Sequence, residues 1–396
     1  MASIQHQKGR PSPYRVFWRD DKTGKKRNKS FSRRKDALAF IETIRIPGNS
    51  IDQISSDLDI AQAMEHWLQQ AKTTGLYGRE QVESSTRRQY ASHCAIISSR
   101  EGATKLDKLD ELECGKLRDR LLGEYSRPYA KKIFTSFKSA MKFATKQGFM
   151  AQNPAADVNI LISKRQRNAS RISIPDLSEV YELTQAIERL MKSKNKNIAK
   201  AWLRYGPLFQ TMLYTGMRPS EIRGFMWSNI DWQRCGVNVT QRADEYCKIG
   251  PLKSGAAMRF IPLPSVVMER LKVWRGNCPH GKYDLVFPSW KGSIENHANI
   301  TNRGWYPLCE EAGLTEKTDG KIKAKYPLYA LRHVKASLEI ELGRSPKRIQ
   351  QIMGHEDIRM TFDVYGHLFQ DQSAHEDADA AFNLIQRVAK ELPEKN

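Results

Sequence analysis

The side chains best suited to chemistry in this sequence lie in its second half, and the first of them are basic. Arg218 stands in the segment YTGMRPSEI, which ends one apolar helix and begins another, so this arginine is held at a helix start. Lys253 stands in or near a turn between two predicted strands, where a lysine can project into a cleft. Guanidinium and ammonium groups bind phosphate oxygens, so both positions are suited to chemistry on a phosphate.

Three more candidates follow toward the C-terminus. Arg332 stands in the segment YALRH, just before an apolar helix. Ser345-Pro346 opens a further helix that closes at MGH, the segment containing His355, and Tyr365 follows ten residues later. Taken one at a time, these residues also fit ordinary structural roles. Arg218 could be a surface cap, Lys253 a solvated turn lysine, His355 a polar loop residue and Tyr365 an aromatic residue of the core.

The order and the local sequence of these segments point further. TGMRPSEIRGFMW, YALRHVKASLEIELG and IMGHEDIRMTFDVYGHL match, in order, the signature boxes of the tyrosine recombinases, the phage-integrase type of enzyme. The sequence resembles that family over nearly its whole length. The resemblance implies two catalytic arginines, a hairpin lysine, a second-box histidine and a tyrosine nucleophile, which are Arg218 and Arg332, Lys253, His355 and Tyr365.

The implied reaction is attack of the Tyr365 hydroxyl on a DNA phosphate, and the residue types suit it. Two guanidinium groups can stabilise the charge of the five-coordinate phosphorus in place of a metal ion. The bond energy is kept as a 3′-phosphotyrosine, Lys253 would protonate the leaving 5′-oxygen, and His355 would hydrogen-bond the phosphate or help to deprotonate the tyrosine. No Asp/Glu cluster with metal-ligand spacing accompanies these segments, so we expect no metal, no cofactor and no ATP.

The sequence departs from the family pattern at one position. Tyr329 stands three residues before Arg332, where the family most often has histidine. A phenol can still hydrogen-bond a phosphate oxygen, so we keep Tyr329 among the site residues. His333 is assigned no chemistry, and Glu221 either braces Arg218 on the same helix or is a first-turn acid favoured by the helix dipole.

Composition agrees with a nucleic-acid partner. The formal net charge of the 396-residue chain is +21 and the pI is near 9.7, which favours polyanions. Mean hydropathy is −0.62, no apolar run approaches the roughly 20 residues of a spanning helix, and the N-terminus lacks the pattern of a secretory signal. We therefore expect a protein of the cytoplasm that associates with the nucleoid and has no membrane partner.

The first 45 residues are the most basic part of the chain, with 13 Lys/Arg against 4 Asp/Glu. Two short strands, 14–19 and 27–31, surround a turn, and a helix follows from about residue 33 to 44. Such a sheet can lie in a DNA groove, with phosphate or base contacts from Arg15, Arg19, Lys25, Lys26 and Arg27. The alternative is a solvated basic face.

Residues 58–148 have the apolar periodicity of amphipathic helices. The last of these helices places lysines between its apolar positions, and we expect DNA contacts from Lys131, Lys132 and Lys138. The predicted fold class is multidomain and mainly α with small β-sheets. Its parts are an arm-type DNA-binding domain (1–50), a helical core-binding domain (57–155), a linker (156–174) and a mixed α+β catalytic domain with a C-terminal helix (175–396).

The favoured function is a mobile-element integrase. The resemblance implies that a homotetramer, monomeric or weakly associated when free, pairs double-stranded DNA attachment sites and exchanges strands through a Holliday junction. An excisionase or a host DNA-bending protein would assist, and the cargo would be a prophage or genomic island. Two alternatives stay open: a type IB topoisomerase, which would relax DNA without an attachment site, and a DNA-binding regulator that has lost the chemistry.

Overall fold

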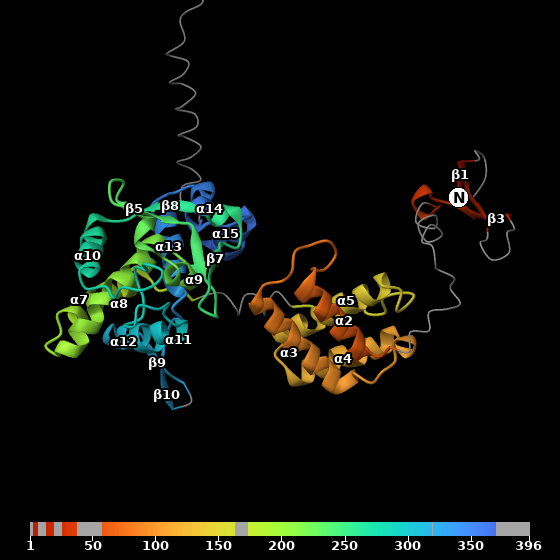
Figure 1. The fold of residues 1–396 in the computed structure, drawn as a ribbon, viewed down its shortest axis with the longest axis horizontal. Coiled ribbons are helices and arrows are strands. Elements are labelled where there is room, and N and C mark those ends of the chain that lie inside the picture. Colours follow the sequence, from red (N-terminus) through yellow and green to blue (C-terminus); the bar gives the residue numbers. More distant parts are fainter. Residues whose placement is uncertain are drawn as a thin grey trace, which may run out of the picture. The chain divides into compact units, whose positions relative to one another are not determined.

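The structure is a computed structural model that describes residues 3–6, 13–19, 26–37, 58–162, 173–318 and 320–369. The chain divides into two compact units, residues 1–167 and 168–396, and the division falls within the predicted linker. Figure 1 shows the elements of each unit. Among helices in the described ranges, none combines the length and the apolar character needed to cross a membrane.

The N-terminal part of the first unit contains a three-stranded antiparallel sheet in the order β1-β2-β3, formed by Ser3–His6, Tyr14–Arg19 and Lys26–Phe31. The two predicted strands are confirmed, whereas β1 was not predicted because its four residues carry no alternating pattern. Val16 is fully buried and packs with Ala37. The predicted helix begins in the described range, at residues 34–37, and its remainder lies outside it.

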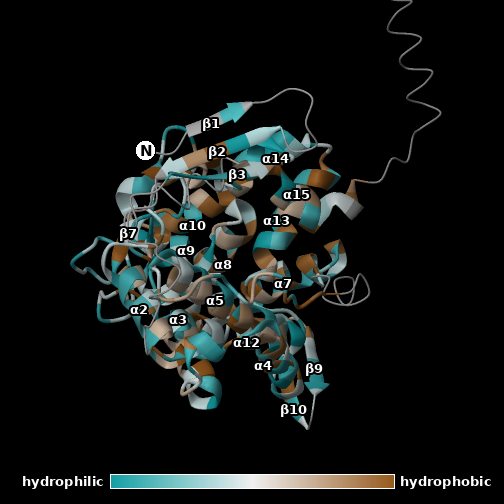
Figure 2. Ribbon diagram, turned by 90° about the vertical axis from the view of Figure 1, so that its right-hand side faces the viewer, coloured by the Kyte–Doolittle hydropathy of each residue, from teal (hydrophilic) through white to brown (hydrophobic). Residues whose placement is uncertain are grey.

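The rest of the first unit is a helical body over residues 58–162. Its helices are α2 (Ile60–Thr73), α3 (Ser84–Glu101), the short 3-10 helix η1 (Leu106–Lys108), α4 (Glu111–Glu124) and α5 (Arg127–Lys146). Trp67, Phe134 and Phe137 are at most 2% exposed and form the centre of the core. The periodicity of α5 is the reason, because its apolar residues recur every three or four positions and face the other helices. Figure 2 shows such hydrophilic and hydrophobic residues alternating along the same helices.

The second unit is built on α8, a long apolar helix. The helices before and around the first candidate arginine are α7 (Leu177–Met191), α8 (Lys196–Thr215) and α9 (Pro219–Arg223). A strand-rich insert follows, with η2 (Trp227–Asn229), β4 (Ile230–Asp231), β5 (Gly236–Val239), β6 (Gln241–Ala243), β7 (Ile249–Pro251), η3 (Gly255–Ala257) and β8 (Arg259–Pro262). The sheets are antiparallel, in the orders β4-β5-β8 and β6-β7. The predicted strand-rich insert is therefore confirmed.

The helices after the insert complete this unit. They are α10 (Ser265–Arg275), α11 (His297–Ile300), the π-helical turn η4 (Thr301–Trp305), α12 (Tyr306–Glu311), α13 (Ala330–Glu341), α14 (Pro346–Met353), α15 (Ile358–Tyr365) and the turn η5 (Gly366–Leu368). An exposed hairpin of β9 (Thr315–Thr318) and β10 (Lys321–Ala324) interrupts them where we predicted helices. Its polar residues gave no strand signal. The predicted C-terminal helix lies outside the described residues.

Candidate active site

Local sequence sets the backbone of the site at two helix ends. Gly216 terminates α8 in a left-handed conformation, with φ 62°, and Pro219 then starts α9, so Arg218 becomes the N-cap residue. Gly354 terminates α14 in the same way, with φ 62° and ψ 47°, directly before His355. The carbonyl oxygens of both glycines also accept hydrogen bonds from the candidate arginines.

The end of α14 holds three arginines from three other elements. Arg259 Nε donates to the carbonyl of Ile352 over 2.7 Å, Arg332 Nη2 donates to that of Met353, and Arg218 Nη2 donates to that of Gly354 over 3.2 Å. The last carbonyls of a helix have no partner within the helix and carry its negative dipole end. They therefore attract the guanidinium groups and bring them together. We call Arg218, Arg259 and Arg332 the arginine cluster.

A buried carboxylate completes the arginine cluster. Glu221 is 1% exposed and forms ion pairs with Arg218 at 2.7 Å and Arg259 at 2.9 Å. Burial by itself would raise the pKa of this carboxyl, but the charges of Arg259 and Arg218 outweigh it, and the pKa lies below its ordinary value. Glu221 thus stays ionised and braces both arginines. Of the two roles that the sequence left open for Glu221, a brace for Arg218 or a first-turn acid favoured by the helix dipole, these contacts favour the brace.

Arg332 is the most enclosed member of the cluster. It is 2% exposed, and Nη1 donates to the Gly216 carbonyl over 2.6 Å. Burial, together with the charge of Arg218, lowers the pKa of its guanidinium to about 10, so the group stays charged at neutral pH. A guanidinium has five N–H donors and the two carbonyls occupy two of them, which leaves donors for a phosphate.

His355 and Tyr365 lie in the same buried region. His355 is 6% exposed, and its Nδ1 atom is 2.9 Å from Thr361 Oγ1. Burial and the neighbouring arginines lower the pKa of this imidazole to about 4, so it is neutral at pH 7. Tyr365 is 1% exposed, and burial raises the pKa of its phenol despite the opposing charge of Arg332. Its hydroxyl is 2.7 Å from Nδ1 of His333.

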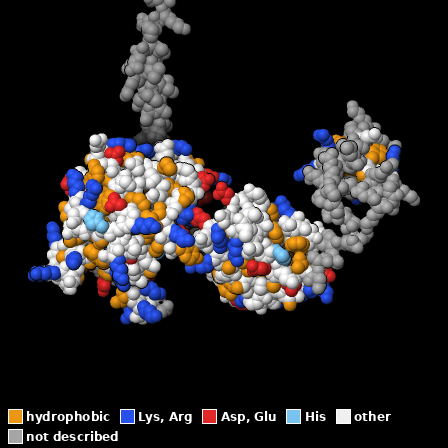
Figure 3. Space-filling view, viewed as in Figure 1, with side chains coloured by type: hydrophobic (Ala, Val, Ile, Leu, Met, Phe, Trp, Pro, Cys, Tyr) orange, Lys and Arg blue, Asp and Glu red, His pale blue; other side chains and the backbone are white. Residues whose placement is uncertain are grey.

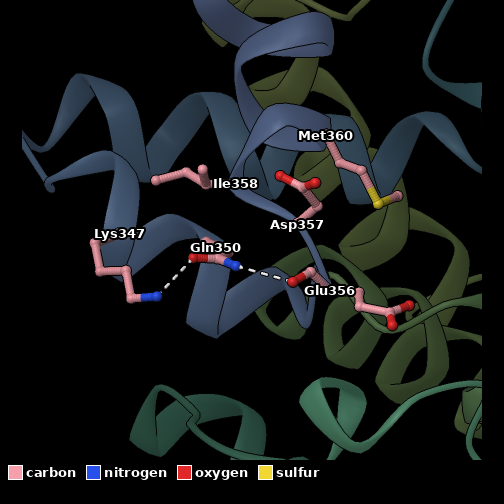
Figure 4. Close-up of a pocket in the computed structure, with 6 residues that line it drawn as sticks. All are labelled: Lys347, Gln350, Glu356, Asp357, Ile358 and Met360. Atoms are coloured by element: carbon pink, nitrogen blue, oxygen red, sulfur yellow. Dashed lines mark hydrogen bonds between the residues drawn. The ribbon is translucent and has the colours of Figure 1, made fainter. Parts of the chain in front are cut away.

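A side-chain contact holds the turn that carries His355. Gln350 donates from Nε2 to the His355 carbonyl over 3.2 Å and accepts a hydrogen bond from Lys347 over 3.0 Å. Figure 4 shows Gln350 between Lys347 and Glu356 in a pocket that also includes Asp357, Ile358 and Met360. Two acids against one lysine make this pocket unsuited to a phosphate. It supports the site but does not form it.

Two predicted site residues lie outside the buried group. Tyr329 is 40% exposed at the start of α13, and its ring lies edge-on to the His333 ring at 5.2 Å. Lys253 is exposed between β7 and η3, and among the described residues it forms no hydrogen bond with Arg218, Arg332 or Tyr365. Within the same ranges, no group of three or more His, Cys, Asp or Glu side chains is arranged to hold a metal ion.

The sequence did not single out Arg259 or assign a role to His333. Arg259 stands on a strand after the lysine, and its side chain is only 5% exposed because Glu221 and the end of α14 surround it. An arginine in a strand gives no signal of such a partner. One signal was nevertheless available. Side chains alternate along a strand, so Arg259 lies on the same face of β8 as the buried Ile261, and this predicts burial of Arg259.

The predicted DNA-binding side chains have different environments. Lys26 and Arg27 are exposed on β3, Arg15 on β2 donates to Asn28 over 2.7 Å, and Arg19 is the last residue of β2. Lys25 lies outside the described residues. Lys131 and Lys132 are exposed on α5, and Figure 3 shows Lys and Arg side chains on the visible surface of the helical body.

Lys138 requires a correction. Its ammonium group donates to the carbonyl oxygens of Ala156 and Val158, over 2.8 and 3.0 Å, and to the side chain of Asn159 over 2.9 Å. A lysine has three N–H donors, and all three are used within the helical body. Lys138 therefore fastens the segment after α5 and is not available to a phosphate. The position of these lysines between apolar residues could not distinguish Lys138 from its exposed neighbours.

Comparison with known proteins identifies relatives that cover the same part of the chain. Residues 183–372 match the model of the phage integrase family, and they include Arg218, Lys253, Arg332, His355 and Tyr365. The XerC-like tyrosine recombinase of Caldanaerobacter subterraneus is 23% identical, over 90% of this chain and 92% of its own length. The prophage integrase IntR of Escherichia coli K12 is 25% identical over 59% of this chain and 56% of its own length.

Solved structures show the same fold. The Tn1549 transposon integrase in complex with a circular intermediate DNA has a TM-score of 0.63 at 16% identity, covering 83% of this chain and 99% of that one. The lambda integrase tetramer bound to a Holliday junction has a TM-score of 0.57 at 18% identity, covering 91% and 93%. The predicted multidomain, mainly α fold with small sheets is thereby confirmed. Residues 183–372 thus belong to the phage integrase family of tyrosine recombinases, enzymes that break and rejoin DNA.

Proposed function

We propose that this recombinase integrates and excises a mobile element, a prophage or genomic island, by cutting double-stranded DNA at attachment sites. The observation that carries the proposal is the arrangement at the end of α14. Arg218, Arg332 and His355 come from separate segments and meet there beside the buried phenol of Tyr365. Fixed guanidinium groups next to an oxygen nucleophile are what phosphoryl transfer requires when the protein supplies the positive charge.

The proposed reaction uses each residue in turn. Arg218 and Arg332 bind the non-bridging oxygens of the scissile phosphate, and Tyr365 Oη attacks the phosphorus. The 5′-oxygen leaves with a proton from Lys253, and the strand stays attached to the enzyme as a 3′-phosphotyrosine. A 5′-hydroxyl from the partner duplex then attacks this ester and releases the tyrosine. No bond energy is lost, so neither ATP nor a cofactor is needed.

Two changes must accompany DNA binding. Tyr365 is 1% exposed, so the groups that cover its hydroxyl have to move before a phosphate can reach it. Lys253 is exposed on the segment between β7 and η3, and this segment must fold over the scissile phosphate to deliver a proton. Both changes make cleavage depend on cognate DNA, which protects the genome from uncontrolled cutting.

The proposed assembly and location follow from the same role. Strand exchange between two duplexes needs a homotetramer and proceeds through a Holliday junction. The arm-type domain (1–50), with its basic β1-β2-β3 sheet, binds arm sites on the DNA. The helical core-binding domain (57–155) and the catalytic domain (175–396) enclose the core site. An excisionase or a host DNA-bending protein sets the direction. The enzyme acts at the nucleoid, where its substrate is.

A nicked suicide duplex carrying the candidate attachment core tests the proposal. The nick lets the short 5′ product diffuse away, so a covalent protein–DNA band accumulates on a denaturing gel in buffer containing EDTA. We expect the band with wild-type protein and none with Tyr365→Phe. No band from wild-type protein on DNA that it binds would contradict the proposal, and relaxation of a plasmid without any attachment site would favour a topoisomerase instead.

A further inference from the structure

The hydroxyl of Tyr365 has a defined partner in the structure, and that partner is His333. Nδ1 of His333 is 2.7 Å from Tyr365 Oη, and the two residues are 6% and 1% exposed. His333 directly follows Arg332 on α13, whereas Tyr365 ends α15. A contact between residues 32 positions apart, enclosed on both sides, fixes the phenol against the imidazole.

The other candidate bases point elsewhere. Nδ1 of His355 is hydrogen-bonded to Thr361 at 2.9 Å, and Tyr329 presents its ring edge to His333. Among the described residues, His333 is the hydrogen-bond partner of the Tyr365 hydroxyl. His355 is therefore free to donate through Nε2 to a phosphate oxygen, which is one of the two roles that the sequence left open.

His333 is in the protonation state that a proton acceptor needs. Burial and the charge of Arg332 lower the pKa of its imidazole to about 4, so the ring is neutral at pH 7 and has one unprotonated nitrogen. Burial raises the pKa of the Tyr365 phenol, so the phenol does not ionise by itself near neutral pH. Transfer is then favourable only while the bond to phosphorus forms, when the phosphate charge stabilises the imidazolium.

We propose that His333 is a further catalytic residue, which accepts the Tyr365 proton through Nδ1 as Oη attacks the phosphate. The Oη–H bond breaks as the Oη–P bond forms and the P–O5′ bond breaks, and the proton moves to His333. On rejoining, the imidazolium returns the proton to the departing phenolate. The proposal rests on the proposed recombinase reaction, and it explains how a chain with Tyr329 in the place of the usual histidine activates its nucleophile.

The variant His333→Asn provides the first test. The asparagine oxygen can accept a hydrogen bond near the position of Nδ1 but is not protonated at neutral pH. On the nicked duplex we expect single-turnover cleavage to fall by roughly 10²- to 10³-fold, as for loss of a general base. Ser337→Ala is the matched control, because it removes a hydrogen bond to the His333 carbonyl on the same helix without removing an acceptor nitrogen, and it should remain near the wild-type rate.

A second substrate separates the base from the acid. In a duplex with sulfur in place of the bridging 5′-oxygen, the leaving thiolate needs no proton. This duplex should restore cleavage by Lys253→Ala and leave His333→Asn slow. Cleavage by His333→Asn within about threefold of wild type, or its restoration by the sulfur substrate, would overturn the proposal.

The pH dependence gives a readout that a structural role would not change. The titratable and charged groups around His333 are Arg332 and Tyr329 on its own helix, Tyr365 on α15 and His355 after α14. His333→Asn should cleave faster as the pH rises from 7 to 9, because the phenol must now lose its proton to solvent, while the wild-type rate stays flat. A flat profile for the variant would contradict the base assignment.

Folding and function are checked in the same experiment. Thermal unfolding and DNA binding of His333→Asn are compared with those of wild type, and the pH profile is measured on protein that passes both. If wild-type protein forms no adduct, the recombinase proposal fails and the base assignment fails with it. If wild type forms the adduct and His333→Asn does so equally fast, only the base assignment fails.

Discussion

Two basic regions of this chain carry the same charge in opposite environments. The arginine cluster is enclosed at the end of α14, where Arg259 and Arg332 are 5% and 2% exposed. The lysine row of α5, consisting of Lys131, Lys132 and Lys142, is exposed along a helix whose opposite face is the core. Burial strengthens the electrostatic interactions of the guanidinium groups and fixes their positions, whereas salt screens the charges of exposed ammonium groups. The first arrangement suits chemistry and the second suits reversible binding.

The largest effect is expected inside the arginine cluster. Arg332→Lys keeps the charge but loses the planar fork that joins the Gly216 and Met353 carbonyls. We expect covalent adduct formation on the nicked duplex to fall about 10³-fold or more, with DNA binding reduced far less. Equal losses of binding and cleavage would show that Arg332 acts on the ground state alone. Quench-flow cleavage and gel-shift titrations measure the two quantities.

The carboxylate within the cluster should matter for stability. Glu221→Gln removes the partner of two arginines in a buried site, and we expect the free energy of unfolding to fall by about 3 kcal/mol. Glu269→Gln is the matched control, because its ion pair with Lys272 is exposed and should contribute little. Chemical denaturation compares the two. Equal changes for both variants would contradict the bracing role.

Acid should destabilise the catalytic unit through its two buried histidines. His333 and His355 have pKa values of about 4 in the folded protein against an ordinary value of 6.5. Between these values the unfolded chain binds protons that the folded chain does not, so stability falls as the pH drops from about 6.5 toward 4. His355→Asn should flatten this dependence. Denaturant midpoints measured across that window would reveal it, and an unchanged slope would count against neutral histidines.

The lysine row should change binding but not stability. The double variant Lys131→Ala/Lys132→Ala should weaken binding to any duplex and reduce the slope of log affinity against log salt by about 2, if both contact phosphates. Its melting temperature should stay the same. Lys138→Ala should lower the melting temperature and leave the salt slope unchanged, because that lysine donates hydrogen bonds to Ala156, Val158 and Asn159. A salt slope lowered by Lys138→Ala would reverse this assignment.

The smallest effect is expected at the rim of the site. Tyr329 is 40% exposed and touches His333 through its ring, so Tyr329→Phe keeps the contact and loses only the hydroxyl. We expect cleavage within about threefold of wild type, well below the effect of losing a general acid or base. A loss of 100-fold would instead support direct contact of this phenol with the phosphate, and single-turnover cleavage decides between them.

The sequence by itself determined the helices and the identities of the candidate residues. The periodicity of α5, the Gly216 and Pro219 signals around Arg218 and the Ser345 to Gly354 bounds of α14 are local, because capping and amphipathic spacing depend on neighbouring residues. The boxes around Arg332 and Tyr365 are local in the same sense. Each could therefore be recognised before any contact was known.

Only the tertiary structure decided which groups meet. The carbonyls of Ile352, Met353 and Gly354 gather arginines from elements up to 136 residues away, and no local pattern records that partnership. The same holds for His333 against Tyr365 and for the capture of Lys138 by the segment after α5. Hydrogen bonding and desolvation act on distances in space, so the roles of these side chains became visible only once the chain was folded.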